Sequence, residues 1–100
     1  MSWTRYSPLL LALVAAGPAM AGSLDADDAR RLRDAGEILP LSEILQRARD
    51  AQPGRVIEVE LEDTGEEVVY ELEVLDAGGV VWELQLDARS GAVLKRVPED

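Results

Sequence analysis

The chain has 100 residues, 20 of them acidic and 10 basic, so its length allows one domain at most and its formal net charge is −10 at pH 7. An acidic excess argues against nucleic acid as a partner, because phosphates require a basic surface. The absence of histidine and cysteine removes the commonest general base, thiol nucleophiles, the usual zinc ligands, disulfides and lipid attachment through cysteine.

The first 21 residues have the order of a secretory signal peptide. Arg5 gives the start one positive charge, an apolar run extends from Leu9 to Ala16, and Ala19 and Ala21 flank the expected cleavage site. A membrane anchor is the alternative, but a span takes about 20 apolar residues and this run is far shorter. We therefore expect residues 1–21 to be cleaved off, export to the periplasm or the medium, and no stable membrane anchor afterwards.

Two helices are predicted after the signal peptide. Residues 22–37 contain a short helix, from Leu24 to Ala35, in which aspartates precede arginines, an order that complements the helix dipole. Its apolar content is low, so we expect loose docking. A second helix from about Leu41 to Gln52 has apolar residues at helical spacing on one face, and Pro53-Gly54 ends it.

From Arg55 onward the hydrophobic period is two, which predicts strands. Turn signals separate four of them: Val56 to Asp63, Val68 to Leu75, Val80 to Asp87 and Ala92 to Val97. Short turns make an antiparallel meander, and the second helix covers its apolar face. The predicted fold class is therefore α+β, a helix packed on a four-stranded antiparallel sheet, with residues 98–100 as a tail.

The alternation predicts an apolar inner face and an acidic outer face. Ile57, Val59 and Leu61 point inward in the first strand, and core packing is the expected role of Tyr70 and Trp82. Six glutamates share the outer face: Glu58, Glu60, Glu62, Glu71, Glu73 and Glu83. Two interpretations stay open, a surface that receives a basic partner or cations, and a solvated surface that resists aggregation.

Like charges that face each other across strands disfavour pairing by up to about 1 kcal/mol, and Lys95 and Arg96 are expected to help to offset this repulsion. The two outermost strands leave backbone groups free, so a partner strand could add at either edge. Charged residues on both edges are also the usual protection against such pairing. An open, solvated strand face gives no reason for a raised catalytic pKa, so no enzymatic activity, cofactor or metal is predicted.

The closing part of the chain resembles a known family. Its segment from Asp87 to Leu94, DARSGAVL, is similar to the D-A-x-T-G-x-x-L turn and final strand of PepSY domains. Tyr70 matches an aromatic residue in the second strand of that family. We assign residues 38–97 to a PepSY-like domain, in which Tyr70, Asp87 and Gly91 are motif residues with an expected structural role. Two departures are Pro40, where a capping serine or threonine is common, and Ser90, where threonine is commoner.

The resemblance implies a module that is not catalytic and that acts outside the cytoplasm. Relatives occur in inhibitory pro-segments of secreted metallopeptidases and in regulators of enzymes that lyse the cell wall. The implied function is binding of another protein, with inhibition or modulation of an envelope or secreted peptidase or of an extracytoplasmic sensor. The alternative is a cation-binding or sensory protein that uses the acidic sheet face.

Overall fold

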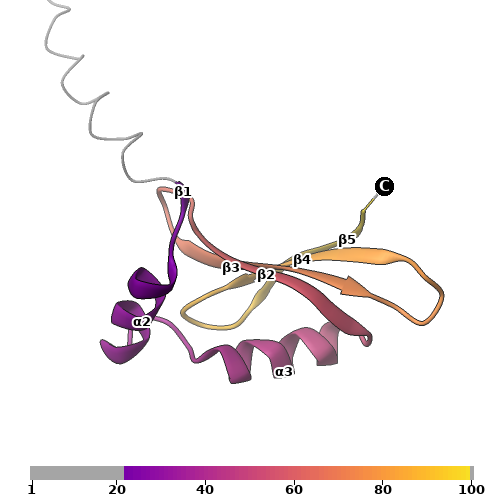
Figure 1. The fold of residues 1–100 in the computed structure, drawn as a ribbon, viewed down its shortest axis with the longest axis horizontal. Helices are drawn as coiled ribbons and strands as arrows, with labels where there is room; N and C mark the ends of the chain where they lie inside the picture. Colours follow the sequence, from indigo (N-terminus) through magenta and orange to yellow (C-terminus); the bar gives the residue numbers. More distant parts are fainter. Residues whose placement is uncertain (1–21, 100) are drawn as a thin grey trace, which may run out of the picture.

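The computed structural model describes residues 22–99 (Figure 1), and the predicted signal peptide lies outside them. The elements, in chain order, are β1 Gly22–Ser23, α2 Ala26–Asp34, α3 Leu41–Ala51, β2 Arg55–Asp63, β3 Val68–Leu75, β4 Val81–Asp87 and β5 Val93–Pro98. The α+β class and the two helices are confirmed. Within the described residues, no helix has the length and apolar character that crossing a membrane would take.

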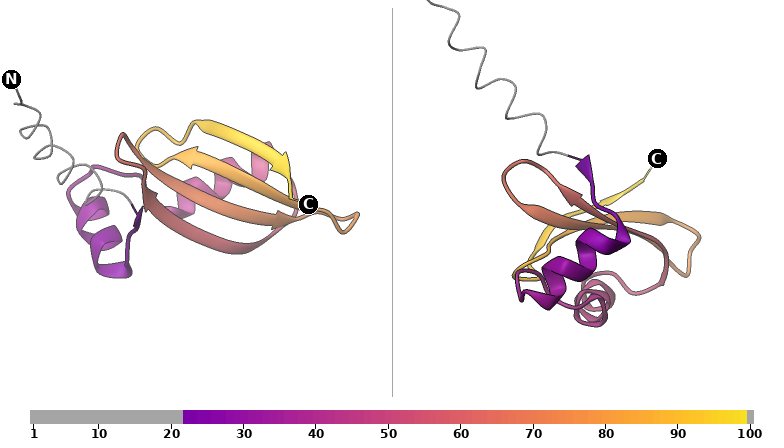
Figure 2. Two further views of the ribbon diagram at one scale, coloured as in Figure 1. Left: turned by 90° about the horizontal axis from the view of Figure 1, so that it is seen from above. Right: turned by 60° about the vertical axis from the view of Figure 1, so that its left-hand side comes forward.

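The sheet is antiparallel throughout, with its strands in the order β1-β2-β3-β4-β5 (Figure 2). The predicted count of four strands is corrected to five, because β1 adds beside β2 through the pairs Gly22 with Asp63 and Ser23 with Glu62. Two residues without apolar alternation give no periodic signal, so the sequence could not predict this strand. The last strand extends one residue past the predicted end at Val97, since Pro98 belongs to β5, and the amide of Glu99 donates to the Val81 carbonyl at 2.7 Å.

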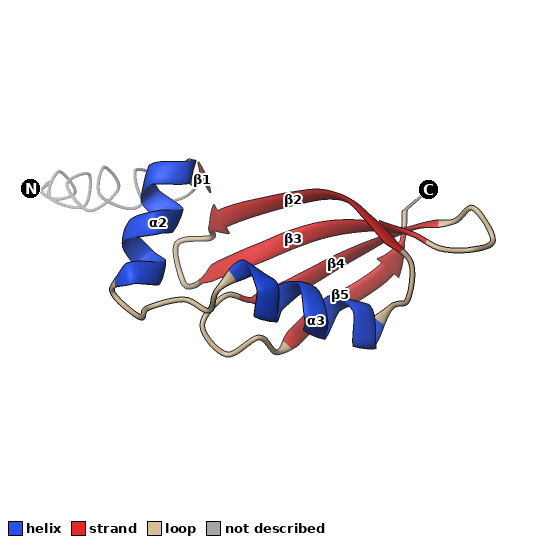
Figure 3. Cartoon of the chain, turned by 60° about the horizontal axis from the view of Figure 1, so that its bottom comes forward, coloured by secondary structure: helices blue, strands red, loops and turns tan. Residues whose placement is uncertain are grey.

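Both helices lie on the same side of the sheet (Figure 3). Ile44 and Ala48 of α3 are fully buried against a sheet surface that includes Leu72, Leu84 and Leu86. Each large apolar side chain that is fully buried stabilises the fold by about 1.5–3 kcal/mol. This one-sided arrangement leaves the opposite face of the sheet free of helices in the described part of the chain.

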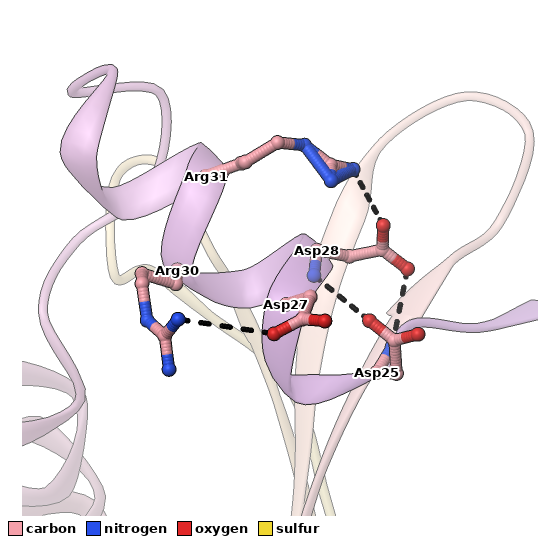
Figure 4. Close-up of polar contacts among 5 residues, drawn as sticks. All are labelled: Asp25, Asp27, Asp28, Arg30 and Arg31. Atoms are coloured by element: carbon pink, nitrogen blue, oxygen red, sulfur yellow. Dashed lines mark hydrogen bonds and ion pairs between the residues drawn. The ribbon is translucent and has the colours of Figure 1, made fainter.

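The start of α2 is fixed by its own acidic residues (Figure 4). Asp25 accepts from the amide of Asp28 at 2.8 Å, and the Asp28 side chain accepts from the amide of Asp25 at 3.2 Å, which forms a capping box. Arg31 pairs with Asp28 one turn later, and Arg30 lies 3.8 Å from Asp27. The aspartates therefore satisfy the helix start, as their position at its N-terminus predicts.

Helix α2 packs against the core more closely than its low apolar content predicts. Ala29 is buried in the common core, and Leu24 and Leu32 pack against that core. Arg33 donates to the hydroxyl of Tyr70 at 3.3 Å, and this hydroxyl donates to the carbonyl of Leu39 at 3.4 Å. Tyr70 thus connects α2 and the segment after it to the middle of the sheet.

Two side chains differ from their predicted placement. A bulge in β2 between Val56 and Glu58 leaves Ile57 44% exposed, and Val56 takes the inner position opposite Val74. A bulge places two residues opposite one, so it shifts the alternation that the sequence suggests. In β5, Arg96 pairs with Leu84 and lies on the helix side, so it cannot offset charge on the outer face.

Candidate functional site

The six predicted glutamates lie together on the sheet face that carries no helix. We call this surface the acidic sheet face; it consists of Glu58, Glu60, Glu62, Glu71, Glu73 and Glu83. Three pairs of them are direct cross-strand neighbours: Glu58 with Glu73, Glu60 with Glu71, and Glu73 with Glu83. Regular alternation in β3 and β4, and in β2 beyond its bulge, produces this arrangement.

Three of these carboxylates form the densest part of the acidic sheet face. Single oxygens of Glu60, Glu62 and Glu71 all lie within 4.8 Å of one another. Two of them accept hydrogen bonds from neutral groups: Ser23 donates its hydroxyl to Glu60 at 2.8 Å, and the Gln85 amide donates to Glu71 at 3.4 Å. Hydrogen bonds of this kind hold the carboxylates in place without neutralising them.

Positive charge reaches only the margin of the acidic sheet face. Among the residues that the structure describes, its one ion pair joins Lys95 of β5 to Glu83, with 3.5 Å between Nζ and Oε1. The expected contribution of Lys95 is therefore found at this margin. The carboxylates of β2 and β3 are left to repel one another.

Two of these glutamates have a raised pKa, for which desolvation is the first cause and like charge the second. Desolvation raises the pKa of Glu62, and the negative charges of Glu71 and Glu60 raise it further. Desolvation likewise raises the pKa of Glu73, followed by the charges of Glu99 and Glu58. The surface is thus a region of negative potential that favours protons, and by the same physics other cations or basic side chains.

Glu99 is an acidic neighbour that the sequence reasoning missed. Glu99 falls in the tail predicted from the sequence. In the structure, the hydrogen bond from its backbone amide to the Val81 carbonyl extends the pairing between β4 and β5 beyond Pro98. Continuing the alternation from Lys95 through Val97 would have placed Glu99 on the outer face. Negative charge on the outer side of the sheet therefore continues from the acidic sheet face to Glu99.

The shape of the acidic sheet face is shallow. A depression on it has a volume of about 80 Å³ and is lined by Glu58, Glu60, Glu71, Leu72, Glu73 and Glu83. Pockets that enclose small molecules usually measure about 300–1,000 Å³. The face is thus suited to contact with another surface and poorly suited to enclosing a substrate.

The motif residues at the end of β4 build a turn. One carboxylate oxygen of Asp87 accepts from the amides of Arg89 at 2.8 Å and Ser90 at 3.0 Å. These hydrogen bonds lower the pKa of Asp87, and the bond from the Ser90 amide has the largest effect. The Ser90 hydroxyl accepts from the amide of Ala92 at 3.2 Å, a bond that a threonine hydroxyl can also make.

Gly91 completes this turn for two reasons. Its φ of +80° is a conformation that other residues rarely adopt. The side chain of Arg47 from α3 also covers it, so that a Cβ at this position would lie only 3.0 Å from Arg47 Cζ. Tyr70 is 2% exposed. Asp87 and Gly91 thus shape the turn after β4, and Tyr70 is packed in the core.

Comparison with protein families gives one match. Residues 38–97 match the PepSY family, described as "Peptidase propeptide and YPEB domain". No curated protein and no solved structure is significantly similar to the chain. PepSY domains are protein-interaction domains of regulatory or propeptide type and typically act outside the cytoplasm. Because the match covers more than half of the sequence, this chain belongs to the PepSY family.

Proposed function

We propose that this chain is an exported binding module that holds a basic surface of a partner protein on its acidic sheet face. By this contact it inhibits or modulates an envelope or secreted peptidase, or an extracytoplasmic sensor. The observation that carries the proposal is the uncompensated set of carboxylates on an open sheet face. Membership of a family of protein-interaction domains supports the same reading.

Electrostatics supports a basic partner. Each cationic side chain that reaches between Glu60 and Glu71 relieves a like-charge contact and gains two attractive ones. Salt screens exposed charges within about 10 Å at 0.1 M ionic strength, so the attraction acts mainly at contact and during approach. The proposed binding should therefore weaken strongly as salt is added.

Shape supports a macromolecule as the ligand. The depression of about 80 Å³ encloses too little of a small substrate, whereas an open sheet face can lie flat against a protein surface. Regulation by contact, without chemistry at the face itself, is consistent with the regulatory or propeptide type of the family.

Charge reversal tests the proposal. A triple variant with Glu58→Lys, Glu60→Lys and Glu71→Lys is compared with the full chain in crosslinking experiments on envelope extract and in activity assays on a panel of secreted metallopeptidases. The matched control reverses three exposed acids outside the face, Asp34, Glu37 and Glu66. The proposal requires that crosslinking or inhibition be lost in the first variant and kept in the control. Equal behaviour of the two variants would place the contact elsewhere.

A second candidate function is cation binding at Glu60, Glu62 and Glu71, because their oxygens lie within 4.8 Å of one another. Calcium takes six to eight oxygen ligands, so these three carboxylates would have to share the ion with several waters. Calorimetric titration with calcium and with magnesium separates the two functions. Binding that is millimolar or weaker would count against this candidate and leave protein binding as the function.

A further inference from the structure

We propose that the free edge of β2 binds an extended segment of the partner in which basic and apolar residues alternate. The edge in question, called the β2 edge below, runs from Ile57 to Glu60. The inference rests on the proposed function, and it adds where the partner's backbone lies and what sequence pattern it carries. Strand addition of this kind takes affinity from backbone hydrogen bonds and specificity from alternate side chains.

Within residues 22–99 no strand pairs with the β2 edge, because β1 is too short to cover it. The amide of Leu24 donates to the carbonyl of Leu61 at 2.9 Å, and the chain then turns away at Asp25 to begin α2. Successive residues of an antiparallel strand direct their backbone groups to opposite sides. The backbone N–H and C=O of Val59 therefore face the same side as those of Leu61, where β1 no longer runs (Figure 3).

The side chains that flank the β2 edge differ on the two faces of the sheet. On the helix side, Val59 lies opposite Leu72 and is 38% exposed, because α3 makes its main sheet contacts with β4 and β5. On the other side, Glu58 and Glu60 belong to the acidic sheet face. A strand added here places alternate residues beside an exposed valine and beside two carboxylates, which suits apolar and basic residues in turn.

The opposite edge of the sheet is protected in ways that the β2 edge lacks. Lys95 lies in the middle of β5 and is paired with Glu83, and Pro98 at its end has no N–H to donate. Lysine and proline are the residues by which sheets commonly blunt an edge. Both edge strands carry a bulge; in β2 the bulge at Ile57 limits the open stretch to the residues between it and β1.

A second copy of the chain is a poor occupant of the β2 edge. Antiparallel pairing of two β2 edges would bring Glu58 and Glu60 of one copy against the same glutamates of the other, and each copy carries a formal net charge of −10. Like charges placed opposite each other destabilise strand pairing. Charge complementarity therefore selects a basic segment of a different protein.

The experiment uses a synthetic seven-residue peptide that alternates lysine and valine, with blocked termini, and the purified full chain. A second peptide has the same side chains but N-methylated central amides, so it keeps the charge and loses backbone donors. We expect the first peptide to bind about tenfold more tightly than the second, since one or two backbone hydrogen bonds are at stake. Amide exchange at Val59 should slow on binding, while Glu60, which faces β3, should not change.

A protein variant gives an independent measurement. Val59→Pro removes the free N–H without altering charge, and proline is accepted where a strand N–H faces solvent; Val59→Thr keeps the N–H as the matched control. The proline variant should lose about tenfold in affinity and the threonine variant should not. If the proline variant does not fold by circular dichroism, the comparison of the two peptides still decides.

Three results have different meanings. Loss of binding on N-methylation, with protection of Val59, supports the inference. Equal, salt-sensitive binding of both peptides overturns the inference and leaves the acidic sheet face as a receptor for basic surfaces. Failure of both peptides to bind overturns the inference and also counts against the proposed function.

Discussion

Replacing Glu71 by lysine should stabilise the protein while it weakens partner binding. Glu71 lies directly opposite Glu60, and the carboxylate of Glu62 is within the same 4.8 Å group. A like-charge pair across strands disfavours pairing by up to about 1 kcal/mol, and an opposite-charge pair favours it by about 0.2–1 kcal/mol. Loss of the 3.4 Å bond from Gln85 to Glu71 subtracts about 0.5 kcal/mol, the lower end for such bonds. The expected net gain is about 0.5–1.5 kcal/mol at low salt.

Urea unfolding followed by far-UV circular dichroism measures this gain. Glu71→Gln separates the removal of repulsion from the addition of attraction and should give a smaller gain than Glu71→Lys. Glu66→Lys, at an exposed position outside the acidic sheet face, controls for the change in net charge. The gain should shrink in 0.5 M salt because screening shortens the range of the interaction. A destabilised Glu71→Lys protein, or a gain that salt does not change, would refute the idea that the face carries uncompensated repulsion.

The remaining predictions concern the turn glycines and the response to pH. Gly54→Ala should destabilise the fold by about 2–4 kcal/mol, because the added Cβ would lie 2.5 Å from a backbone carbonyl oxygen of β3 and because φ at this position is +151°. Gly36→Ala is the control, since φ there is +73° but the space around it is open. In the same urea assay it should show only the cost of backbone strain, about 1 kcal/mol. Because the folded state raises the pKa of Glu62, its contribution favours folding increasingly as the pH falls toward the ordinary value of 4.5. Hydrogen bonds lower the pKa of Asp76 and Asp87, so their stabilisation is present above the ordinary value of 3.8 and is lost below it. Thermal unfolding from pH 7 to pH 3 should therefore show a maximum between these regimes, and a melting temperature that falls steadily from pH 7 would contradict the assignment.

The sequence predicted most of the sheet because alternation is a strong signal wherever one face is buried. The pattern from Val68 to Asp87 placed Tyr70, Leu72 and Leu84 inside and the glutamates outside, as they lie in the structure. The same reasoning failed at Ile57, where a bulge inserts a residue that no periodic pattern reveals. Bulges depend on how two strands fit each other, and this information is not local in sequence.

The sequence predicts which glutamates lie on the candidate site, but it does not predict which residues border them. Its six glutamates follow from period two alone, whereas the neutral donor Ser23 and the additional acid Glu99 depend on pairing at the two ends of the chain. The open β2 edge was foreseen only as one of two edges. Its distinction from β5 needed the extent of β1 and the path of α2, both set by tertiary packing.

Arg96 lies on the helix side of the sheet and adds no positive charge to the acidic sheet face. Alternation sends the neighbouring cations of β5 to opposite sides: Lys95 reaches Glu83, while Arg96 donates to Gln52 at 3.1 Å and lies 4.4 Å from the ring centre of Trp82. Gln52 is 7% exposed, so Arg96 satisfies a buried amide at the end of α3 and is committed to the helix side.

Among the described residues, the outer face has one paired cation, Lys95 on the strand farthest from β2, and Arg55 at the start of β2 forms no ion pair. Glu58 and Glu60 of β2 form no ion pair among the described residues, and they flank the stretch of β2 that β1 does not cover. A basic extended segment would meet both features in one contact, and an acidic or globular ligand would meet at most one. For this reason the comparison between normal and N-methylated peptides distinguishes a composite binding surface from charge attraction alone.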